Sequence, residues 1–384
     1  MSRAPKSIAV LGTRGIPANY GGFETAAEFI AIGLREAGFD VTVSCEMDPA
    51  LPEELPTAYR GVRLARFPVR DDLRPLSEII YDVRALLSLG RRADIIYMFG
   101  YGAGFSFWLA KLLRKKLIVN CDGLEWARPK FDRLSRFLLR VNEALGLMAA
   151  DVIIADSQNI QDYIRKTYGR SSHFLPYGTK IPDAPQPWDR AALERAKGGL
   201  SDEITPDEFY LILSRIEPDN NIAQILRGFS QSKSLRKILV VGRAPSRQYW
   251  AQLQSIATRD PRIVLAGPIY DLPLKNALRW NCAGYFHGHM VGGTNPALLE
   301  GLASGNVILA TDVPFNREVV GGNGYPAYFF HPLPSEVRDV TDKVDDQVLH
   351  LRKVARVKGP QRIQEGYCWE RIVDGYRDLL KSMV

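Results

Sequence analysis

The chain has few of the residues from which metal centres and disulfide frameworks are built. Only four cysteines occur among its 384 residues, and no two share the short spacing of a zinc site. They stand far apart, at Cys45, Cys121, Cys282 and Cys368. The five histidines include His287 and His289, whose alternate spacing near a predicted strand end fits the lining of a site better than a metal centre. We therefore expect neither a disulfide framework nor a metal.

Long hydrophobic runs and low-complexity tracts are also missing. No run of eighteen apolar residues occurs, and residues 1–12 pass from a short polar start directly into a predicted strand. The sequence thus predicts neither a membrane span nor a signal peptide, and we expect a cytoplasmic protein. A length of 384 residues exceeds one ordinary hydrophobic core and indicates two domains.

The formal charge of +7 is concentrated in one part of the chain. Between Phe105 and Val141, basic residues alternate with aromatic and aliphatic ones and outnumber the acidic residues. The basic residues are Lys111, Arg114, Lys115, Lys116, Arg128, Lys130, Arg133, Arg136 and Arg140. Such a stretch suits peripheral contact with an anionic membrane, and a solvated helix face beside an ordinary core explains it equally well. No nucleic-acid-binding motif accompanies the charge, so we expect no nucleic-acid partner.

Strands and helices alternate through the amino-terminal half. A buried strand at Ser7–Gly12 precedes a long loop, Thr13–Gly22, which contains several glycines. An amphipathic helix then ends at Gly38, and the next strand follows at 39–44. This βαβ unit predicts a parallel sheet. Further strands are expected at residues 94–98, 117–120 and 152–155.

The second half repeats this organisation after a linker, 180–187, that contains three prolines. Strands are expected at 208–214, 237–241, 262–266, 283–286 and 307–310. The fold class is therefore α/β, with two Rossmann-like, doubly wound parallel-sheet domains at residues 1–180 and 187–366. An amphipathic helix in 367–384 is expected to pack back on the first domain. Domains of this kind place their strand ends across a cleft from one another, where a nucleotide binds.

The most informative segment is Gly292–Glu300, which connects a short buried strand to a helix. Asn295 is a favourable N-cap and Pro296 a favourable first helical residue. The amides of Gly293, Thr294 and the first turn should then form an anion site. Two glycines before an ordinary helix are the plainer interpretation. Arg215 follows the first strand of the second half, where its guanidinium can clamp a phosphate or form an inter-domain ion pair.

Three segments together resemble those of a known family, the retaining family 4 glycosyltransferases of the GT-B fold. They are residues 13–25, residues 120–126 and residues 292–300, and within the family they resemble a rhamnosyltransferase-like subgroup. The resemblance extends over nearly the whole chain. It implies a nucleotide-sugar-dependent hexosyltransferase, with an activated sugar as donor and no metal cofactor.

The resemblance also assigns roles to individual residues. It implies that Glu300 hydrogen-bonds the nucleotide ribose and that Arg215 binds the diphosphate. The family's donor-hexose glutamate is replaced here by Gly292, and the lysine that follows the arginine is replaced by Asn220. Further groups would then have to bind the negative charge of the diphosphate as well. These are Arg14, the amides of Gly21 and Gly22, and the segment formed by Gly293, Thr294 and Asn295.

Asp122 stands where many relatives carry a histidine near the reacting carbon. Its carboxylate is a candidate for orienting an acceptor hydroxyl or for stabilising the anomeric centre, and a helix cap is the alternative. The catalytic candidates are therefore Asp122, Arg215 and Glu300. Glu24 and Asp156 are weaker candidates, because acids at helix starts are commonly caps.

The function expected from the resemblance is transfer of L-rhamnose from dTDP-rhamnose to a lipid-linked saccharide in bacterial surface polysaccharide synthesis. Such an acceptor places the enzyme at the inner face of the cell membrane. Two alternatives stay open at this point. One is a nucleotide-sugar epimerase of similar architecture, and the other is a non-catalytic scaffold protein, which the missing glutamate and lysine favour.

Overall fold

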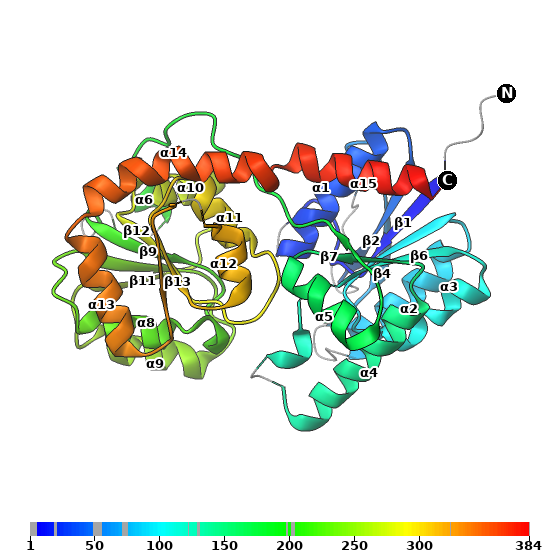
Figure 1. Ribbon diagram of the computed structural model, residues 1–384, viewed down its shortest axis with the longest axis horizontal. Helices are drawn as coiled ribbons and strands as arrows, with labels where there is room; N and C mark the ends of the chain where they lie inside the picture. Colours follow the sequence, from blue (N-terminus) through cyan, green and yellow to red (C-terminus); the bar gives the residue numbers. More distant parts are fainter. Residues whose placement is uncertain are drawn as a thin grey trace. The chain divides into compact units, whose positions relative to one another are not determined.

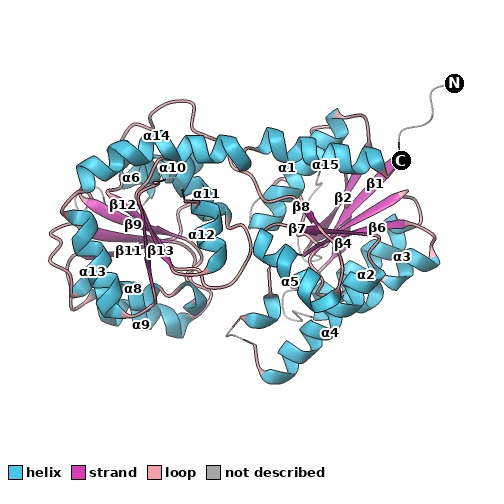
Figure 2. Cartoon of the chain, viewed as in Figure 1, coloured by secondary structure: helices cyan, strands magenta, loops and turns pink. Residues whose placement is uncertain are grey.

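The chain folds into two compact units (Figure 1). The computed structural model describes residues 6–18, 21–48, 56–70, 76–121, 123–128, 131–196, 199–200, 204–322 and 324–383. Unit 1 comprises Met1–Tyr177 and Trp369–Val384, and unit 2 comprises Gly178–Cys368. Helices lie on both sides of each sheet (Figure 2).

Unit 1 is built on a sheet with the strand order β3-β4-β2-β1-β5-β6-β7-β8. All neighbours pair in parallel except β3, which is antiparallel to β4. The strands are β1 (Ser7–Leu11), β2 (Asp40–Met47), β3 (Ala58–Tyr59), β4 (Val62–Pro68), β5 (Ile95–Phe99), β6 (Lys116–Cys121), β7 (Val152–Ala155) and β8 (His173–Phe174). The helices are α1 (Gly22–Glu36), α2 (Leu76–Gly90), α3 (Trp108–Leu112), α4 (Arg133–Ala149), α5 (Gln158–Tyr168) and α15 (Trp369–Ser382), with 3-10 turns η2 (Gly104–Ser106) and η3 (Glu125–Ala127).

Unit 2 is built on a sheet with the order β11-β10-β9-β12-β13-β14, in which every neighbouring pair is parallel. The strands are β9 (Phe209–Leu213), β10 (Lys237–Val241), β11 (Ile263–Gly267), β12 (Gly284–His287), β13 (Ile308–Thr311) and β14 (Ala327–Phe330). The helices are α6 (Arg190–Ala196), α8 (Ile222–Ser230), α9 (Arg247–Ala257), α10 (Leu272–Asn281), α11 (Pro296–Ala303), α12 (Pro314–Val320), α13 (Pro334–Asp345) and α14 (Val348–Gly366), with the 3-10 turn η4 (Pro218–Asn220).

The central strands of both sheets are apolar along their whole length. β5, for example, is buried at all five positions, and β9 at four of five. Helices on both faces remove both sets of side chains from water, so these strands carry continuous hydrophobic runs instead of an alternating pattern. This arrangement leaves polar side chains at the carboxyl ends of the strands, where the connecting loops begin.

The carboxyl-terminal helix α15 belongs to unit 1. Its Trp369 ring stacks on Phe29 of α1, with centroids 4.5 Å apart and planes within 5°. Its Tyr376 hydroxyl lies 2.9 Å from the Tyr97 hydroxyl of β5. Because helix and sheet share these buried contacts, α15 is held as part of the unit 1 core. Among the described residues, no helix has the length and apolar character needed to cross a bilayer.

Candidate functional site

Each sheet contains one point at which the strand order reverses. In unit 2 this point lies between β9 and β12, which are neighbours although two strands separate them in the chain. In folds of this kind the connections from two such strands leave toward opposite sides of the sheet, and ligands bind at the carboxyl ends of the strands. The loop after β9 carries Arg215, and the loop after β12 leads to Gly292–Asn295. The topology therefore brings two of the predicted segments to one place.

The two loops of unit 2 are fixed to each other by main-chain contacts. A Cβ atom on Gly288 would lie 2.0 Å from the Asn220 carbonyl oxygen, so only glycine allows this approach. The Asn221 side-chain amide donates to the Gly288 carbonyl at 2.8 Å. The buried Asn220 amide donates in turn to the Arg215 carbonyl at 2.7 Å. Asn220, predicted to bind the donor, thus uses its amide nitrogen to hold the Arg215 loop.

The Arg215 side chain is about half exposed, and its guanidinium lies 3.6 Å from the Glu217 carboxylate. Glu217 is itself largely buried in the same loop. An exposed guanidinium with one carboxylate beside it is oriented yet open to a further anionic partner. The ion pair lies within one loop of unit 2.

Helix α11 begins as predicted, with Asn295 as N-cap and Pro296 following it. The Asn295 side chain accepts from the Ala297 amide at 3.0 Å, and its carbonyl accepts from Leu298. The first-turn amides are therefore satisfied internally, which corrects the expectation that they point outward together. The main-chain amides of Gly293 and Asn295 donate to no other described residue. An anion site here would be formed by the loop amides and the helix dipole.

Gly292 has a backbone φ of +144°, which L side chains rarely adopt. A glutamate at this position would strain the main chain as it stands. The backbone conformation thus gives a physical reason for glycine at this position. Apart from its chain neighbours, no described residue would have an atom within 4 Å of a Cβ here.

Glu300 forms an ion pair with Arg279 of α10. The arginine is almost completely buried, whereas the Glu300 side chain is 39% exposed. Arg279 also donates to the Asn276 side chain at 3.2 Å, and its carbonyl accepts from Asn306 at 2.6 Å. A buried guanidinium held by several partners fixes one carboxylate oxygen of Glu300 and leaves the other for a ligand.

A second cation, Lys275, lies beside this ion pair. Burial and the charge of Arg279 lower the pKa of the Lys275 ammonium, while Glu300 opposes that shift. The Asp271 carboxylate opposes the shift as well, so two cations and two carboxylates lie near one another here. Sequence reasoning missed both residues, because a lysine and an arginine on a helix normally indicate a solvated face. The apolar neighbours of Arg279, Leu278 and Trp280, were the available signal.

His287 ends β12 and is fully buried, with its ring stacked on that of His289 at a centroid distance of 4.3 Å. Burial, reinforced by His289, keeps the pKa of His287 well below its usual value, so the ring is neutral. Its Nε2 atom has no hydrogen-bond partner among the described residues. In the part of the chain that the structure describes, no group of histidine, cysteine and acidic side chains could hold a metal ion.

The corresponding loop of unit 1 lies between β1 and β5, where that sheet reverses its order. The Arg14 amide donates to the buried Glu24 carboxylate at 3.1 Å, and its guanidinium pairs with Glu78 at 3.6 Å. Gly21 caps α1 and accepts from the Thr25 amide at 3.2 Å, and Gly22 is the first helical residue. Carboxylates therefore already contact Arg14, one of the groups predicted to bind phosphate here.

Further acids surround this loop. The Glu28 carboxylate accepts from the Ala18 amide at 2.7 Å. Burial, with added repulsion from Glu78 and Glu46, raises the pKa of Asp82 to about 7. Unit 1 thus presents an acidic site at its strand-order reversal, in contrast to unit 2. Asp122, the predicted acceptor-side carboxylate, lies outside the described residues.

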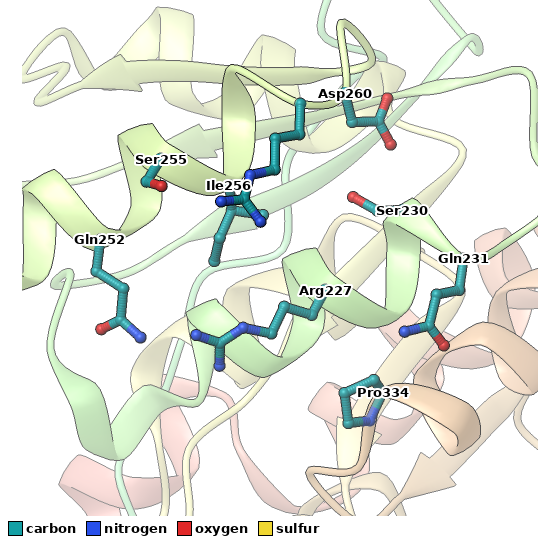
Figure 3. A pocket seen from close by; sticks show the side chains of 9 residues that line it. Arg227, Ser230, Gln231, Gln252, Ser255, Ile256, Asp260 and Pro334 are labelled. Atoms are coloured by element: carbon teal, nitrogen blue, oxygen red, sulfur yellow. The ribbon is translucent and has the colours of Figure 1, made fainter.

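A separate hollow in unit 2 is formed by α8, α9 and the start of α13 (Figure 3). Its lining residues include Ser230 and Gln231 at the end of α8 and Ile256 near the end of α9. In a parallel α/β sheet the helices run antiparallel to the strands, so helix ends lie near the amino ends of the strands. This hollow is therefore on the opposite edge from Arg215 and Glu300.

Comparisons with known proteins agree with this architecture. Residues 5–180 match a family model described as a domain of unknown function, DUF1972. No curated protein matches the chain. A structure of HepE from Anabaena in complex with UDP aligns at a TM-score of 0.74 with 18% identity, over 98% of this chain and 100% of that chain.

Two further structures are similar over almost the whole length. Sucrose-phosphate synthase from Thermosynechococcus elongatus has a TM-score of 0.78 at 17% identity, covering 98% of this chain and 99% of that one. The α,α-trehalose 6-phosphate synthase from Burkholderia multivorans has a TM-score of 0.73 at 14% identity, covering 99% and 97%. At these identities the likeness shows the fold alone. The chain has the GT-B fold, with two Rossmann-like parallel-sheet domains, which confirms the predicted fold class.

Proposed function

We propose that this chain is a retaining glycosyltransferase that moves a sugar from a nucleoside diphosphate to a lipid-linked saccharide. The donor we favour is dTDP-rhamnose, and the process is bacterial surface polysaccharide synthesis. The acceptor places the enzyme in the cytoplasm at the inner face of the cell membrane, in peripheral contact with the bilayer. The rhamnosyltransferase-like character comes from the resemblance of residues 13–25, 120–126 and 292–300.

One observation carries the proposal. At the strand-order reversal of unit 2, an exposed guanidinium lies in the loop after β9, and a carboxylate held by a buried arginine lies in α11, the helix that follows β12. A nucleoside diphosphate presents a diphosphate and a sugar hydroxyl, which are the partners that these two groups bind best. The UDP in the HepE complex and the UDP-glucose in a further HepE complex support this class of donor.

The proposed chemistry assigns each group to a charge that changes during transfer. The bond between the anomeric carbon and the diphosphate oxygen breaks, and negative charge grows on the leaving group. Arg215, the loop amides of Gly293 and Asn295 and the α11 dipole stabilise that charge, each well-placed donor contributing about 3 kcal/mol by analogy with oxyanion holes. The acceptor oxygen bonds to the same face of the anomeric carbon, and its proton passes to the departing phosphate.

Asp122 is proposed to orient the acceptor hydroxyl. A change of Asp122 to Asn then slows transfer while leaving donor affinity near the wild-type value, measured by turnover and calorimetry on the same preparation. Equal transfer rates for the variant and the wild type would reduce Asp122 to a structural role.

The donor is identified by thermal shift with dTDP-, UDP- and GDP-sugars, since this screen fixes base and sugar together. We expect the largest stabilisation with dTDP-rhamnose. Incubation of the preferred donor without acceptor then distinguishes transfer from epimerisation. Intact donor supports a transferase, whereas conversion of the sugar without acceptor would overturn the proposal.

A further inference from the structure

Helix α4 of unit 1 has one buried face and, on the opposite side, a row of exposed apolar residues. Glu143, Gly146 and Leu147 lie on its buried face. On the other side, large apolar side chains are open to solvent: Leu134 at 65%, Phe137 at 63%, Leu138 at 51%, Val141 at 39% and Met148 at 60%. At 100° per residue these five side chains fall within one stripe along the helix. An ordinary surface helix carries polar residues at these positions.

The orientation of α4 is fixed by a buried carboxylate. Glu143 is fully buried and accepts hydrogen bonds from the Trp126 indole at 3.1 Å and from the Tyr163 and Tyr168 hydroxyls at 2.6 Å each. Three donors to one buried charge leave little freedom for the helix to rotate. Glu143 lies on the side of α4 opposite the centre of the apolar stripe. The hydrogen bonds to its carboxylate therefore also keep the stripe facing solvent.

Close packing against η2 strengthens this constraint. A Cβ atom on Gly104 would lie 1.9 Å from the Asn142 carbonyl oxygen, so the helix and the turn are in backbone contact. The Phe105 amide donates to the Asn142 side chain at 3.2 Å, and the Phe105 ring is half exposed beside α4. The exposed apolar surface therefore continues from α4 onto the neighbouring turn.

The exposed charges on α4 have one sign. At 100° per residue, Arg133 and Arg140 lie beside the stripe and Arg136 lies farther round, toward the buried face, whereas the only acid within the helix is the buried Glu143. Arg140 is positioned by stacking over the Trp126 ring at 4.0 Å. A stripe of large apolar side chains with arginines beside it matches the boundary between acyl chains and anionic headgroups.

We propose that the exposed stripe of α4 docks the protein on an anionic lipid bilayer, with the helix lying in the plane of the interface. Phe137, Leu138 and Val141 enter the acyl boundary, and Arg133 and Arg140 contact lipid phosphates. The sequence predicted a membrane-contacting stretch over residues 105–141. The proposed contact is confined to α4 and the adjoining turn η2. The choice of lipid over another apolar partner rests on the proposed lipid-linked acceptor and on the positive flank.

Flotation of the full-length protein with vesicles tests this inference without any need for turnover. Wild-type protein is expected to float with phosphatidylglycerol–phosphatidylcholine vesicles and to remain behind with phosphatidylcholine alone. The double change Phe137→Ser and Leu138→Ser should lower partitioning by about tenfold or more. Its control is Leu235→Ser with Leu349→Ser, two apolar residues of unit 2 that are more exposed than Phe137 and Leu138, which should have no effect.

A charge reversal separates the electrostatic part. Arg133→Glu with Arg140→Glu should lower binding to anionic vesicles by about 25-fold or more, at about fivefold or more for each arginine. The matched change Arg247→Glu with Arg259→Glu, at exposed sites of unit 2, should have a much smaller effect. Calorimetry with dTDP on the same variants keeps this result distinct from the proposed function, since α4 takes no part in donor binding.

Two results would overturn the inference. The first is absence of flotation at low salt, or equal flotation of the α4 variants and the wild type. The second is a stable dimer in light scattering that Phe137→Ser with Leu138→Ser dissociates, which would make the stripe a contact between two copies of the chain.

Discussion

The two units place loops at equivalent points of equivalent sheets, yet the surroundings of the arginine in each loop differ. In unit 1 the loop after β1 is held by the Glu24 and Glu28 carboxylates, and Arg14 pairs with Glu78 at 3.6 Å. In unit 2 the loop after β9 carries Arg215, which pairs with Glu217 at the same distance but is more exposed, at 47% against 34%. The same topology thus provides one arginine in a loop held by further carboxylates and another that is more open to an anion. Fold alone would assign a nucleotide to either unit, whereas the side chains favour unit 2.

The largest effect is expected from breaking the buried ion pair of unit 2. Arg279→Met leaves the partly exposed Glu300 carboxylate without its partner and removes the hydrogen bond to Asn276, so the free energy of unfolding should fall by about 2–3 kcal/mol. Urea denaturation measures this loss. Arg317→Met, which breaks the more exposed Arg317–Asp312 pair, is the control and should cost under about 1 kcal/mol. Equal losses of unfolding free energy from both changes would show that Arg279 has no special structural role at the site.

The comparison between the units is tested most sharply by two arginines. Arg215→Ala should weaken binding of dTDP by about thirtyfold, because a charge-assisted contact with the diphosphate is lost. Arg14→Ala should change that affinity by less than about threefold, because Arg14 is less exposed than Arg215 and the Glu24 and Glu28 carboxylates that hold its loop disfavour an anion there. Calorimetry with dTDP provides both values, and thymidine, which lacks the diphosphate, should bind both variants as it binds the wild type. A larger effect at Arg14 would reverse the assignment of the units.

A smaller effect is expected at the sugar hydroxyl. Glu300→Gln keeps the shape of the side chain but removes the charge, so affinity for dTDP should fall by about tenfold. The analogue without the 3′-hydroxyl should bind the variant and the wild type almost equally. Undiminished dTDP affinity in the variant would reject the ribose role of Glu300.

The smallest effect concerns the acidic loop of unit 1. The pKa of Asp82 is raised to about 7, so the folded state binds more protons than the unfolded state between about pH 4 and 7. Stability contributed by the protonated carboxyl is therefore lost as the pH rises through 7. Asp82→Asn should stabilise the protein by about 1 kcal/mol at pH 8 and have almost no effect below pH 4. Thermal unfolding as a function of pH measures the difference in stability between the variant and the wild type. A difference that is the same at every pH would contradict the prediction.

The fold was predictable because its signals are local and repeated. Continuous apolar strands, glycine loops and helix caps such as Asn295 recur along the chain, and each specifies its own element. The strand-order reversal in each sheet follows from the pairing of distant segments, such as β9 with β12, and no local pattern contains it.

The site was predictable only in part, for the same reason. Arg215, Asn295 and Glu300 were found because each stands next to a recognisable strand or helix end. Arg279 and Lys275 were missed because their importance depends on burial against another helix, which the sequence does not display. The expectation for the first-turn amides of α11 was wrong because the Asn295 side chain occupies one of them. In each case the outcome depended on a contact between side chains or main-chain groups that the sequence alone does not display.

Hydrogen exchange with and without dTDP, followed by mass spectrometry of the full-length protein, tests the central claim most directly. We predict that dTDP protects the backbone amides of 214–221 and 289–300 in unit 2, while the loop 13–18 of unit 1 changes much less. Protection confined to the unit 1 loop, or none in the two unit 2 segments at saturating dTDP, would contradict the account.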